Sequence, residues 1–214
     1  MDTVSGIGVL DKAVRILDAV SAGPVRPSDL PERTGISRAT AHRLAVGLEA
    51  HGLLRRTPDG AFVAGLALIS LGRAAADAFP LAAAAAPVLE RLRDRTGEST
   101  QLYVVDGDER LCVAAIDSSH ELRTIVRVGA RLPLDVGSAG HVLCATAGRD
   151  GWVASVAERA SGVASVSAPV RRDDQVIAAV SVSGPIERMT KRPGPTFGAD
   201  VVAAADDLEA ALRR

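Results

Sequence analysis

The chain has 214 residues, which is enough for two small domains or for one larger domain. Its 25 Lys and Arg nearly balance its 26 Asp and Glu, and the formal net charge of −1 excludes a protein that coats polyanions with its whole surface. With one Trp, one Tyr and three Phe, the chain has too few aromatic side chains to stack the bases of single-stranded nucleic acid.

The cysteines and histidines argue against a disulfide framework and against a metal site. Cys112 and Cys144 have apolar neighbours, which favours buried free thiols in a reducing compartment. The four histidines lack metal-ligand spacing and no CxxC motif is present, so we expect no metal and no other cofactor. The chain shows no signal-like start and no apolar run long enough to cross a bilayer, which predicts a cytoplasmic protein without a membrane partner.

The first predicted element is an amphipathic helix. It ends near Gly23 and Pro24, two residues that commonly follow the end of a helix. The apolar residues that recur at helical spacing and define its inner side are Val9, Ala13, Ile16, Leu17 and Val20.

Residues 28–52 have the pattern of a helix-turn-helix. Asp29–Thr34 is a brief helix anchored by Leu30, and Gly35 supplies the turn because a residue without Cβ adopts positive φ cheaply. Ser37 stands at the N-cap of the second helix, where its hydroxyl can accept a backbone N–H. The inward stripe of this second helix consists of Ala41, Leu44, Ala45 and Leu48.

The opposite side of the second helix carries residue types that suit the major groove of DNA. Small residues, Thr, His and Arg allow a helix to approach the base edges closely. We expect Arg43 to reach a base edge with support from Thr40 and His42, while Arg38 holds a phosphate; the alternative for His42 is a bystander on the helix flank. The residues that point outward are Ala39, Arg43, Val46 and Ala50, with Thr40, His42 and Gly47 on the flanks.

A β-hairpin follows the second helix. Leu53–Arg56 and Ala61–Ala64 flank a turn at Pro58–Gly60, and this order of elements predicts a winged helix-turn-helix. Arg55 and Arg56 lie where a wing strand would pass the phosphate backbone. The candidate DNA-binding residues are therefore Ser37, Arg38, Thr40, His42, Arg43, Arg55 and Arg56.

The charge of residues 1–65 limits how they bind DNA. They contain eight Lys/Arg and seven Asp/Glu, a net charge of 8 − 7 = +1, so attraction is local to one face and non-specific binding is weak. A specific, palindromic operator would then need two copies of the module. The alternative is a small helical bundle with solvated arginines, which requires both the wing and the glycine turn to be coincidences.

The composition of residues 66–80 predicts a linker helix. Leu66–Phe79 is rich in Ala and Leu, and Pro80 closes it. A further helix over Leu81–Arg95 carries Pro87, which should kink it or mark its first turn. A helix in this place is either an ordinary connection or the axis of a dimer, and both alternatives stay open.

Beyond Gly97 the pattern changes to period two with β-branched residues, which predicts an α+β domain over residues 81–214 with a mostly antiparallel sheet flanked by helices. The near-repeats ASVSAPV and AVSVSGP form a hairpin that offers valines to one face and serine hydroxyls to the other. The expected strands are 100–105, 110–117, 122–128, 162–171 and 175–184, the expected loop is 132–138, and the expected helices are 139–147 and 198–212.

These motifs resemble the IclR family of bacterial transcriptional regulators along the whole chain. In the first half the resemblance rests on VLDKAVRILDAV, TGISRATAHRLAVGLEAHGLLRR and DGAFVAGLALISLGRAA; in the second it rests on GESTQLYVVDGDERLCVA, VGARLPLDVGSAGHVLCA and AVSVSGPIERM. An unrelated winged helix would not bring the second-half motifs in this order. VASVSAPV and SVSGPIER are most similar to the actinobacterial branch that controls genes of amino-acid biosynthesis and catabolism.

The resemblance implies a DNA-binding regulator, mostly a repressor, whose C-terminal effector-binding domain senses a small metabolite of amino-acid or small-acid metabolism. It also implies a homodimer or a dimer of dimers on double-stranded DNA. It places the effector pocket at the start of the helix after the LPL loop and on the last strands. The matching positions are Ala139, Gly140, Ser155, Ser165, Ser181 and Ser183.

Two departures from the family pattern bear on this pocket. Positions 155 and 165 are often Asp and Cys in relatives and are both Ser here, which argues against a carboxylate-lined pocket and implies a different ligand. Only Thr146–Gly151 joins the GSAGHVLCA helix to the strand of Trp152, where relatives carry more chain. Either a helix and its connection are lost, or that segment is missing from this sequence; a lost wall would open the pocket or change the size of its ligand.

The sequence of the second domain allows three other interpretations. Its strand serines could merely face solvent from an amphipathic sheet. The domain could only dimerise and sense no ligand. It could be an enzyme, but Ser138 lies outside a G-x-S-x-G elbow, His141 has no evident orienting acid, and no phosphate-binding or dinucleotide fingerprint is present, so we assign no catalytic residue.

Overall fold

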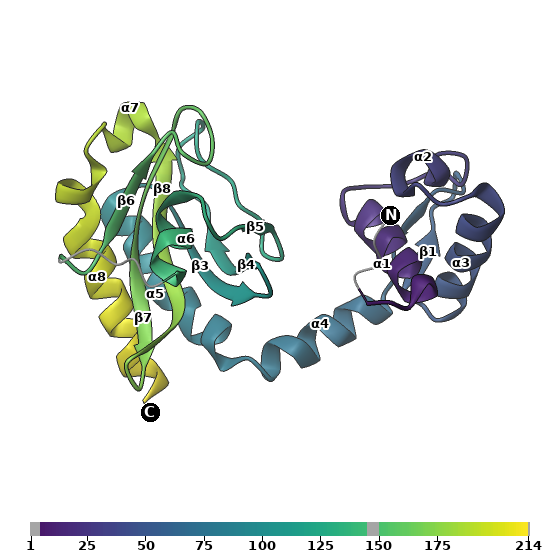
Figure 1. The fold of residues 1–214 in the computed structure, drawn as a ribbon, viewed down its shortest axis with the longest axis horizontal. Helices are drawn as coiled ribbons and strands as arrows, with labels where there is room; N and C mark the ends of the chain where they lie inside the picture. Colours follow the sequence, from purple (N-terminus) through teal and green to yellow (C-terminus); the bar gives the residue numbers. More distant parts are fainter. Residues whose placement is uncertain (1–4, 145–149, 214) are drawn as a thin grey trace. The chain divides into compact units, whose positions relative to one another are not determined.

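The computed structural model describes residues 5–144 and 150–213 (Figure 1). The chain divides into two compact units, Met1–Ala78 and Phe79–Arg214, and each is described by itself. Within the described residues no single helix is long and apolar enough to cross a membrane, although α4 (Ala67–Asp77) and α5 (Pro80–Thr96) would pass that test together as a bent pair.

The N-terminal unit is a winged helix-turn-helix, as predicted. Its hairpin is antiparallel and pairs Leu54 with Ala64 and Arg56 with Phe62. Phe62 also bridges Val25, which ties the loop before the second helix to the wing. The elements are α1 (Gly8–Ser21), α2 (Leu30–Thr34), α3 (Arg38–Ala50), β1 (Leu54–Arg56), β2 (Phe62–Ala64) and α4.

One apolar core holds these elements together. Ile16 of α1, Leu30 of α2 and Phe62 of β2 are completely buried in it. Gly35 has a φ of 66° and donates its N–H to the carbonyl of Pro31 at 2.9 Å, so it ends α2 in the left-handed conformation that the tight turn requires. The orientation of α3 follows from this turn.

Two local details of the first half differ from the expectations. Ser37 occupies the N-cap of α3, but the prediction that its hydroxyl accepts a backbone N–H is wrong. The Ser37 hydroxyl instead donates to the hydroxyl of Thr40 at 3.1 Å, because Thr40 lies one turn further on and within reach. Pro80 opens α5 instead of closing the helix before it, which ends at Asp77, because its fixed φ and missing N–H suit a first turn. α5 then runs through Pro87 as one helix.

The C-terminal unit is the predicted α+β domain, built on one six-stranded sheet in the order β5-β4-β3-β8-β7-β6. Every neighbouring pair of strands is antiparallel. The strands are β3 (Ser99–Asp106), β4 (Glu109–Ile116), β5 (Arg131–Pro133), β6 (Val153–Val156), β7 (Val163–Arg172) and β8 (Gln175–Pro185). The helices are α5, α6 (Gly137–Leu143), α7 (Ile186–Met189) and α8 (Pro193–Leu212).

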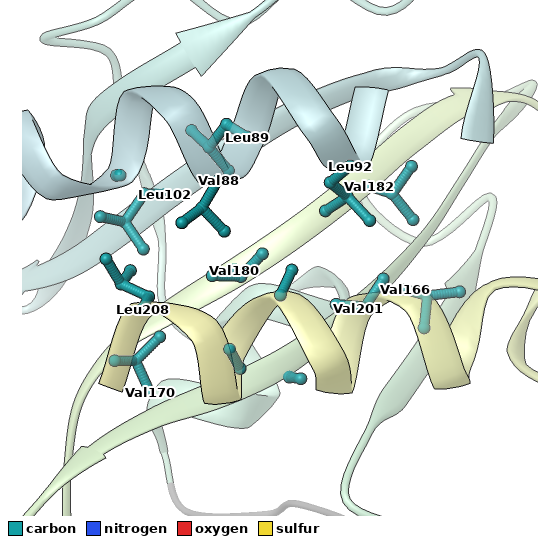
Figure 2. Packing of buried hydrophobic residues seen from close by; sticks show 14 of the residues in the cluster. Val88, Leu89, Leu92, Leu102, Val166, Val170, Val180, Val182, Val201 and Leu208 are labelled. Carbon is teal, nitrogen blue, oxygen red and sulfur yellow. The ribbon is translucent and has the colours of Figure 1, made fainter. Parts of the chain in front are cut away.

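The two faces of the sheet are covered differently. α5 and α8 lie on one face, where Leu89, Val180 and Leu208 pack in the largest apolar cluster (Figure 2). The shorter α6 covers the other face, and Cys112 is buried beside it as predicted. Cys144 is exposed, contrary to the expectation of two buried thiols, because it follows the last residue of α6 and leaves the packed face.

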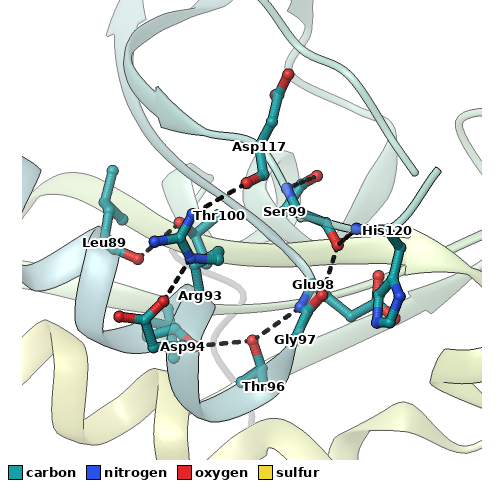
Figure 3. A network of polar contacts seen from close by, with 12 residues as sticks. Leu89, Arg93, Asp94, Thr96, Gly97, Glu98, Ser99, Thr100, Asp117 and His120 are labelled. Carbon is teal, nitrogen blue, oxygen red and sulfur yellow. Dashed lines mark hydrogen bonds and ion pairs between the residues drawn. The ribbon is translucent and has the colours of Figure 1, made fainter. Parts of the chain in front are cut away.

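Polar contacts fasten the junction of α5 and β3 (Figure 3). Gly97 ends α5 with a φ of 73°, and the hydroxyl of Thr100 donates to the carbonyl of Leu89 at 2.9 Å. The hydroxyl of Ser118 donates to the carbonyl of Gly97 at 2.5 Å, while the Ser118 N–H bonds the hydroxyl of Ser99 at 3.0 Å. These contacts hold the start of β3 and the end of β4 against the end of the helix.

The segment before α6 differs from the expectation. Residues 122–128 are not a strand; pairing with β4 begins at Gly129, whose N–H bonds the carbonyl of Cys112 at 2.8 Å after a turn with a φ of 89°. The strand is instead β5, at the start of the expected loop. α6 begins two residues earlier than expected and ends at Leu143, with Cys144 as its C-cap; residues 145–147 of the expected helix, and most of the short connection 146–151, lie outside the described residues.

The last helix, α8, begins at Pro193 instead of Gly198. Gly194 and Gly198 lie in its first turns, where a Cβ on either residue would overlap the indole ring of Trp152. These two glycines leave room for the indole ring of Trp152 against the first turns of α8.

Candidate functional sites

The outer side of α3 faces solvent. Ala41 and Ala45 are buried in the core, as predicted for the inward stripe, while Leu44 of the same stripe is only half-buried. On the opposite side, Ser37, Arg38, His42 and Arg43 are exposed and Thr40 is half-buried. The residues expected to contact DNA therefore lie together on an open helix face that can enter a major groove.

The two wing arginines have different surroundings. Arg55 is exposed and has no ion pair within the described residues. The Nε of Arg56 donates to the carboxylate of Glu49 at 3.1 and 3.2 Å, and its guanidinium lies 4.3 Å from the centre of the Phe62 ring. Arg56 is thus engaged within the unit, between α3 and the wing.

A polar pocket opens between α6 and the sheet. It encloses about 20 Å³, or about 360 Å³ with its open mouth, so its closed part has room for about one water molecule. Five of the six positions that the family resemblance implies line it, namely Ala139, Ser155, Ser165, Ser181 and Ser183. The other lining residues are Tyr103, Arg110, Gly137, Ser138, Arg159 and Val163.

Serine hydroxyls form a network on this face. Ser138 of α6 lies 2.7 Å from both Ser165 and Ser167, and Ser167 donates to Ser181 at 2.9 Å. The register of β7 and β8 places these serines on the same side of the sheet. Ser181 and Ser183 are 2 % and 5 % exposed, so the interpretation in which the strand serines merely face solvent is wrong.

Gly140, the sixth position, does not line the pocket. A Cβ at Gly140 would overlap the carbonyl oxygen of Leu134 and lie 2.6 Å from the Nη1 of Arg110. Its contribution is close packing of α6 on the preceding loop, which only glycine permits.

Arg110 brings a buried cation to the pocket, and the sequence analysis missed it. Its Nη1 donates to the carbonyl oxygens of Pro133 and Val136, the latter at 2.6 Å, and its guanidinium lies 5.5 Å from the ring centre of Tyr103. Burial lowers the pKa of Arg110. A signal existed: Arg110 precedes Cys112 by two residues in a strand and therefore shares its inward face.

Glu158 lies near the mouth of the pocket and accepts a hydrogen bond at 2.6 Å from His141, for which the sequence showed no acid partner. Burial raises the pKa of Glu158, but hydrogen bonds from His141, Ser155 and the Gly137 backbone outweigh it, and the pKa lies below its ordinary value. The Ser138 hydroxyl bonds other hydroxyls, which cannot act as the general base that a serine nucleophile requires.

The arrangement defines a class of protein. A winged helix-turn-helix with an exposed second helix is built to bind duplex DNA, and the pocket belongs to a separate unit. In residues 5–144 and 150–213, no group of three or more His, Cys, Asp or Glu could hold a metal ion. The protein is a DNA-binding transcriptional regulator.

Comparison with known protein families supports this assignment to the DNA-binding regulators. The model of the IclR helix-turn-helix domain matches residues 9–58, and the model described as bacterial transcriptional regulator IclR C-terminal matches residues 73–150 and 145–210. The chain therefore belongs to the IclR family of bacterial transcriptional regulators. The C-terminal match is split at the short connection.

Individual relatives extend the comparison. The chain is 28 % identical to the glycerol operon regulatory protein of Streptomyces griseus over 96 % of this chain and 94 % of that protein. It is 32 % identical to the transcriptional regulator KipR of Bacillus subtilis over 53 % of this chain, but only 46 % of that protein. The solved structure of an IclR homolog from Microbacterium hydrocarbonoxydans complexed with 4-hydroxybenzoate gives a TM-score of 0.82 at 26 % identity, covering 96 % of this chain and 99 % of the other.

Proposed function

We propose that this protein represses or activates genes in response to a small molecule held in the pocket under α6. In this proposal residues 1–65 bind the operator, residues 66–80 are the linker and residues 81–214 bind the effector. The observation that carries the proposal is a set of buried hydroxyls and a guanidinium that border an opening instead of a packed core. Such convergent polar groups are what a small-molecule site uses to orient its ligand.

On DNA, α3 enters the major groove. Arg43 reads a base edge, with Thr40 and His42 in support, because these side chains lie on the open face of the helix. The other candidates, which position the domain on the backbone, are Ser37, Arg38, Arg55 and Arg56.

Two copies act together on a palindromic operator, as a homodimer or a dimer of dimers. No residue of α4 is buried, and Leu66, Ile69 and Leu71 are 69 %, 68 % and 59 % exposed. Val9 and Val14 of α1 are also more than half exposed. Apolar surface of this kind is commonly covered by a partner, and a second copy of the chain would cover it here.

The effector acts through the dimer by changing the spacing of the two recognition helices. It shifts DNA affinity only by the difference between its affinities for the two spacings, which is typically about 1–3 kcal/mol. Serine hydroxyls and backbone N–H groups can hold a carboxylate or an amide. We propose genes of amino-acid or small-acid metabolism as targets.

One observation favours a second candidate, in which the C-terminal unit only dimerises. The enclosed volume of about 20 Å³ is far below the roughly 300–1,000 Å³ of a drug-sized ligand site. Under the first candidate, the effector must therefore be small or extend through the open side of the pocket.

Thermal unfolding of the full chain against a panel of amino acids, keto acids, 4-hydroxybenzoate and glycerol separates the two candidates. The proposal predicts that one class raises the melting temperature and changes the footprint on the DNA upstream of the protein's own gene. Ser165→Ala should weaken this response, whereas Ser161→Ala, at an exposed turn outside the pocket, should leave it intact. Silence across the panel with an unchanged footprint would favour plain dimerisation.

A further inference from the structure

A carboxylate of the chain itself lies at the open side of the pocket under α6. Glu158 belongs to the turn of residues 157–162, which joins β6 to β7. Its Oε1 accepts a hydrogen bond from the Nε2 of His141 at 2.6 Å, and the carboxylate also accepts from the Ser155 hydroxyl and the Gly137 backbone N–H. Ser155 and Gly137 line the pocket. Two donors that an incoming ligand would use are therefore already taken.

The geometry of α6 brings these donors together. Gly137 and His141 are four residues apart in α6 and therefore lie on the same side of its first turn. The N–H of a first helical residue has no partner within its own helix, so the Glu158 carboxylate supplies the acceptor that Gly137 lacks. A Cβ on Gly137 would lie 3.7 Å from the Cβ of Arg159, which shows that the turn of residues 157–162 lies directly against the start of α6.

The charges around Glu158 favour this position of its carboxylate. Burial lowers the pKa of Arg110, and the negative charge of Glu158 partly offsets that effect. Burial raises the pKa of Glu158, but its hydrogen bonds outweigh burial, so the group is ionised at neutral pH. Without Glu158, the guanidinium groups of Arg110 and Arg159 in the pocket lining would lose this nearby negative charge. A second carboxylate would then find the same donors and the same attraction.

Two features keep the contacts of Glu158 open to competition. Ala157, the residue before it, has a φ of 56°, in the left-handed region that a residue with a Cβ rarely adopts, so backbone strain opposes the closed turn. The side chain of Glu158 is also 37 % exposed, so small solutes can reach the carboxylate. A fully buried carboxylate in an unstrained turn would be far harder to displace.

We propose that Glu158 is an autoinhibitory group: in the ligand-free chain its carboxylate occupies the donors at the open side of the pocket, and a ligand enters only by displacing it. The proposal rests on the proposed function, because this pocket is the one assigned to the effector. The apparent affinity of a ligand that needs these donors is its intrinsic affinity multiplied by the fraction of molecules that Glu158 has left. His141 is a positioning residue, which holds Glu158 against α6.

Acetate is the probe, because it carries the same carboxylate as the Glu158 side chain. Melting temperature is measured for the full chain over a concentration series of acetate, with the ionic strength held constant by sodium chloride, for the wild type, Glu158→Ala and His141→Ala. The control is Glu121→Ala, which removes an exposed carboxylate outside the pocket. Hydrogen exchange of the Gly137 amide is followed in the same samples, because its protection depends on its acceptor.

The proposal predicts that acetate stabilises Glu158→Ala at concentrations about 10- to 100-fold lower than it stabilises the wild type, with His141→Ala between the two. Glu121→Ala should behave as the wild type does. The Gly137 amide should exchange slowly in the wild type, rapidly in Glu158→Ala, and slowly again when acetate is added to Glu158→Ala. A purely structural contact does not predict that recovery.

Three results would overturn the proposal. Equal acetate midpoints for the wild type and Glu158→Ala would show that Glu158 does not compete with a ligand. No response of Glu158→Ala would show that the freed donors bind no external carboxylate. A wild type that is silent about a hundredfold above the midpoint of Glu158→Ala would make Glu158 a permanent structural contact. If Glu158→Ala does not fold, Glu158→Gln takes its place with a smaller expected shift, because it loses the charge but keeps an acceptor oxygen.

DNA binding, measured without acetate, separates this inference from the proposed function. A protein that binds duplex DNA through α3 but shows equal acetate midpoints contradicts the autoinhibition alone. A protein with the predicted midpoints that binds no duplex contradicts the proposed regulation and leaves the autoinhibitory role of Glu158 standing.

Discussion

The two carboxylate oxygens of Glu49, in the last turn of α3, share one bifurcated hydrogen bond from the Nε–H of Arg56, at 3.1 and 3.2 Å. This pair links the recognition helix to the wing, and the ring of Phe62 supports the guanidinium from below. One of the arginines assigned to DNA is therefore paired with a carboxylate of its own unit at the surface.

We expect Glu49→Gln to strengthen DNA binding and to steepen its salt dependence, because Arg56 is then released to a phosphate. One additional phosphate contact raises the slope of log K against log salt by about 0.9. Because both side chains are about one-third exposed, the loss of folding stability should stay below about 1 kcal/mol. Fluorescence anisotropy over a salt series gives the slope, and the double variant Glu49→Gln/Arg56→Gln should not show the increase. An unchanged slope in Glu49→Gln would mean that Arg56 never reaches the backbone.

Arg43 and Arg38 should respond differently to truncation. Arg43→Ala is expected to weaken the specific operator by roughly 1–3 kcal/mol and to relax the preference at one base pair. Arg38→Ala should weaken all sequences alike and lower the salt slope by about one. Competition binding with single-base operator variants measures both. Uniform weakening by Arg43→Ala would reduce Arg43 to a phosphate contact.

Two glycine-to-alanine changes should shift stability in opposite directions. Gly140→Ala forces a methyl group onto the carbonyl of Leu134 and should destabilise the C-terminal unit by about 1–3 kcal/mol. Gly72→Ala, in α4 with no atom within 4 Å of the new Cβ, should stabilise its helix by about 0.5–1 kcal/mol. Chemical unfolding of both variants tests this; a neutral Gly140→Ala would show that α6 can move away from its loop without cost.

The two thiols should react at very different rates. Burial raises the pKa of Cys112 to about 12, so at pH 8 its thiol stays protonated and enclosed, whereas Cys144 is exposed. A thiol reagent at pH 8 should modify one cysteine quickly and the second only after denaturation, and Cys144→Ser should remove the fast phase. Two equally fast phases in the wild type would contradict the burial of Cys112.

The winged helix-turn-helix was predictable because its signals are local. Gly35 marks the turn, and the alternation of buried and exposed residues along α3 follows directly from helical spacing. The partner of the Ser37 hydroxyl was not predictable, since the three-dimensional arrangement decides between a backbone N–H and the hydroxyl of Thr40.

The pocket was predictable only in part. Serine positions on β7 and β8 follow from period-two alternation, and the family resemblance supplied Ala139 and Ser155. The spacing of Arg110 from Cys112 placed it on an inward face, but its bonds to the loop before α6 depend on long-range packing, which no local pattern encodes. The same holds for the close approach of Gly194 and Gly198 in α8 to the distant Trp152.

The most direct test of the account is a binding titration of the purified chain with duplex fragments from upstream of its own gene, with and without the compound that raises its melting temperature. Wild type should bind one fragment specifically, Arg43→Ala should lose that preference, and the compound should change the wild-type affinity. Equal affinity of wild type and Arg43→Ala for every fragment, with no effect of the compound, would contradict the account.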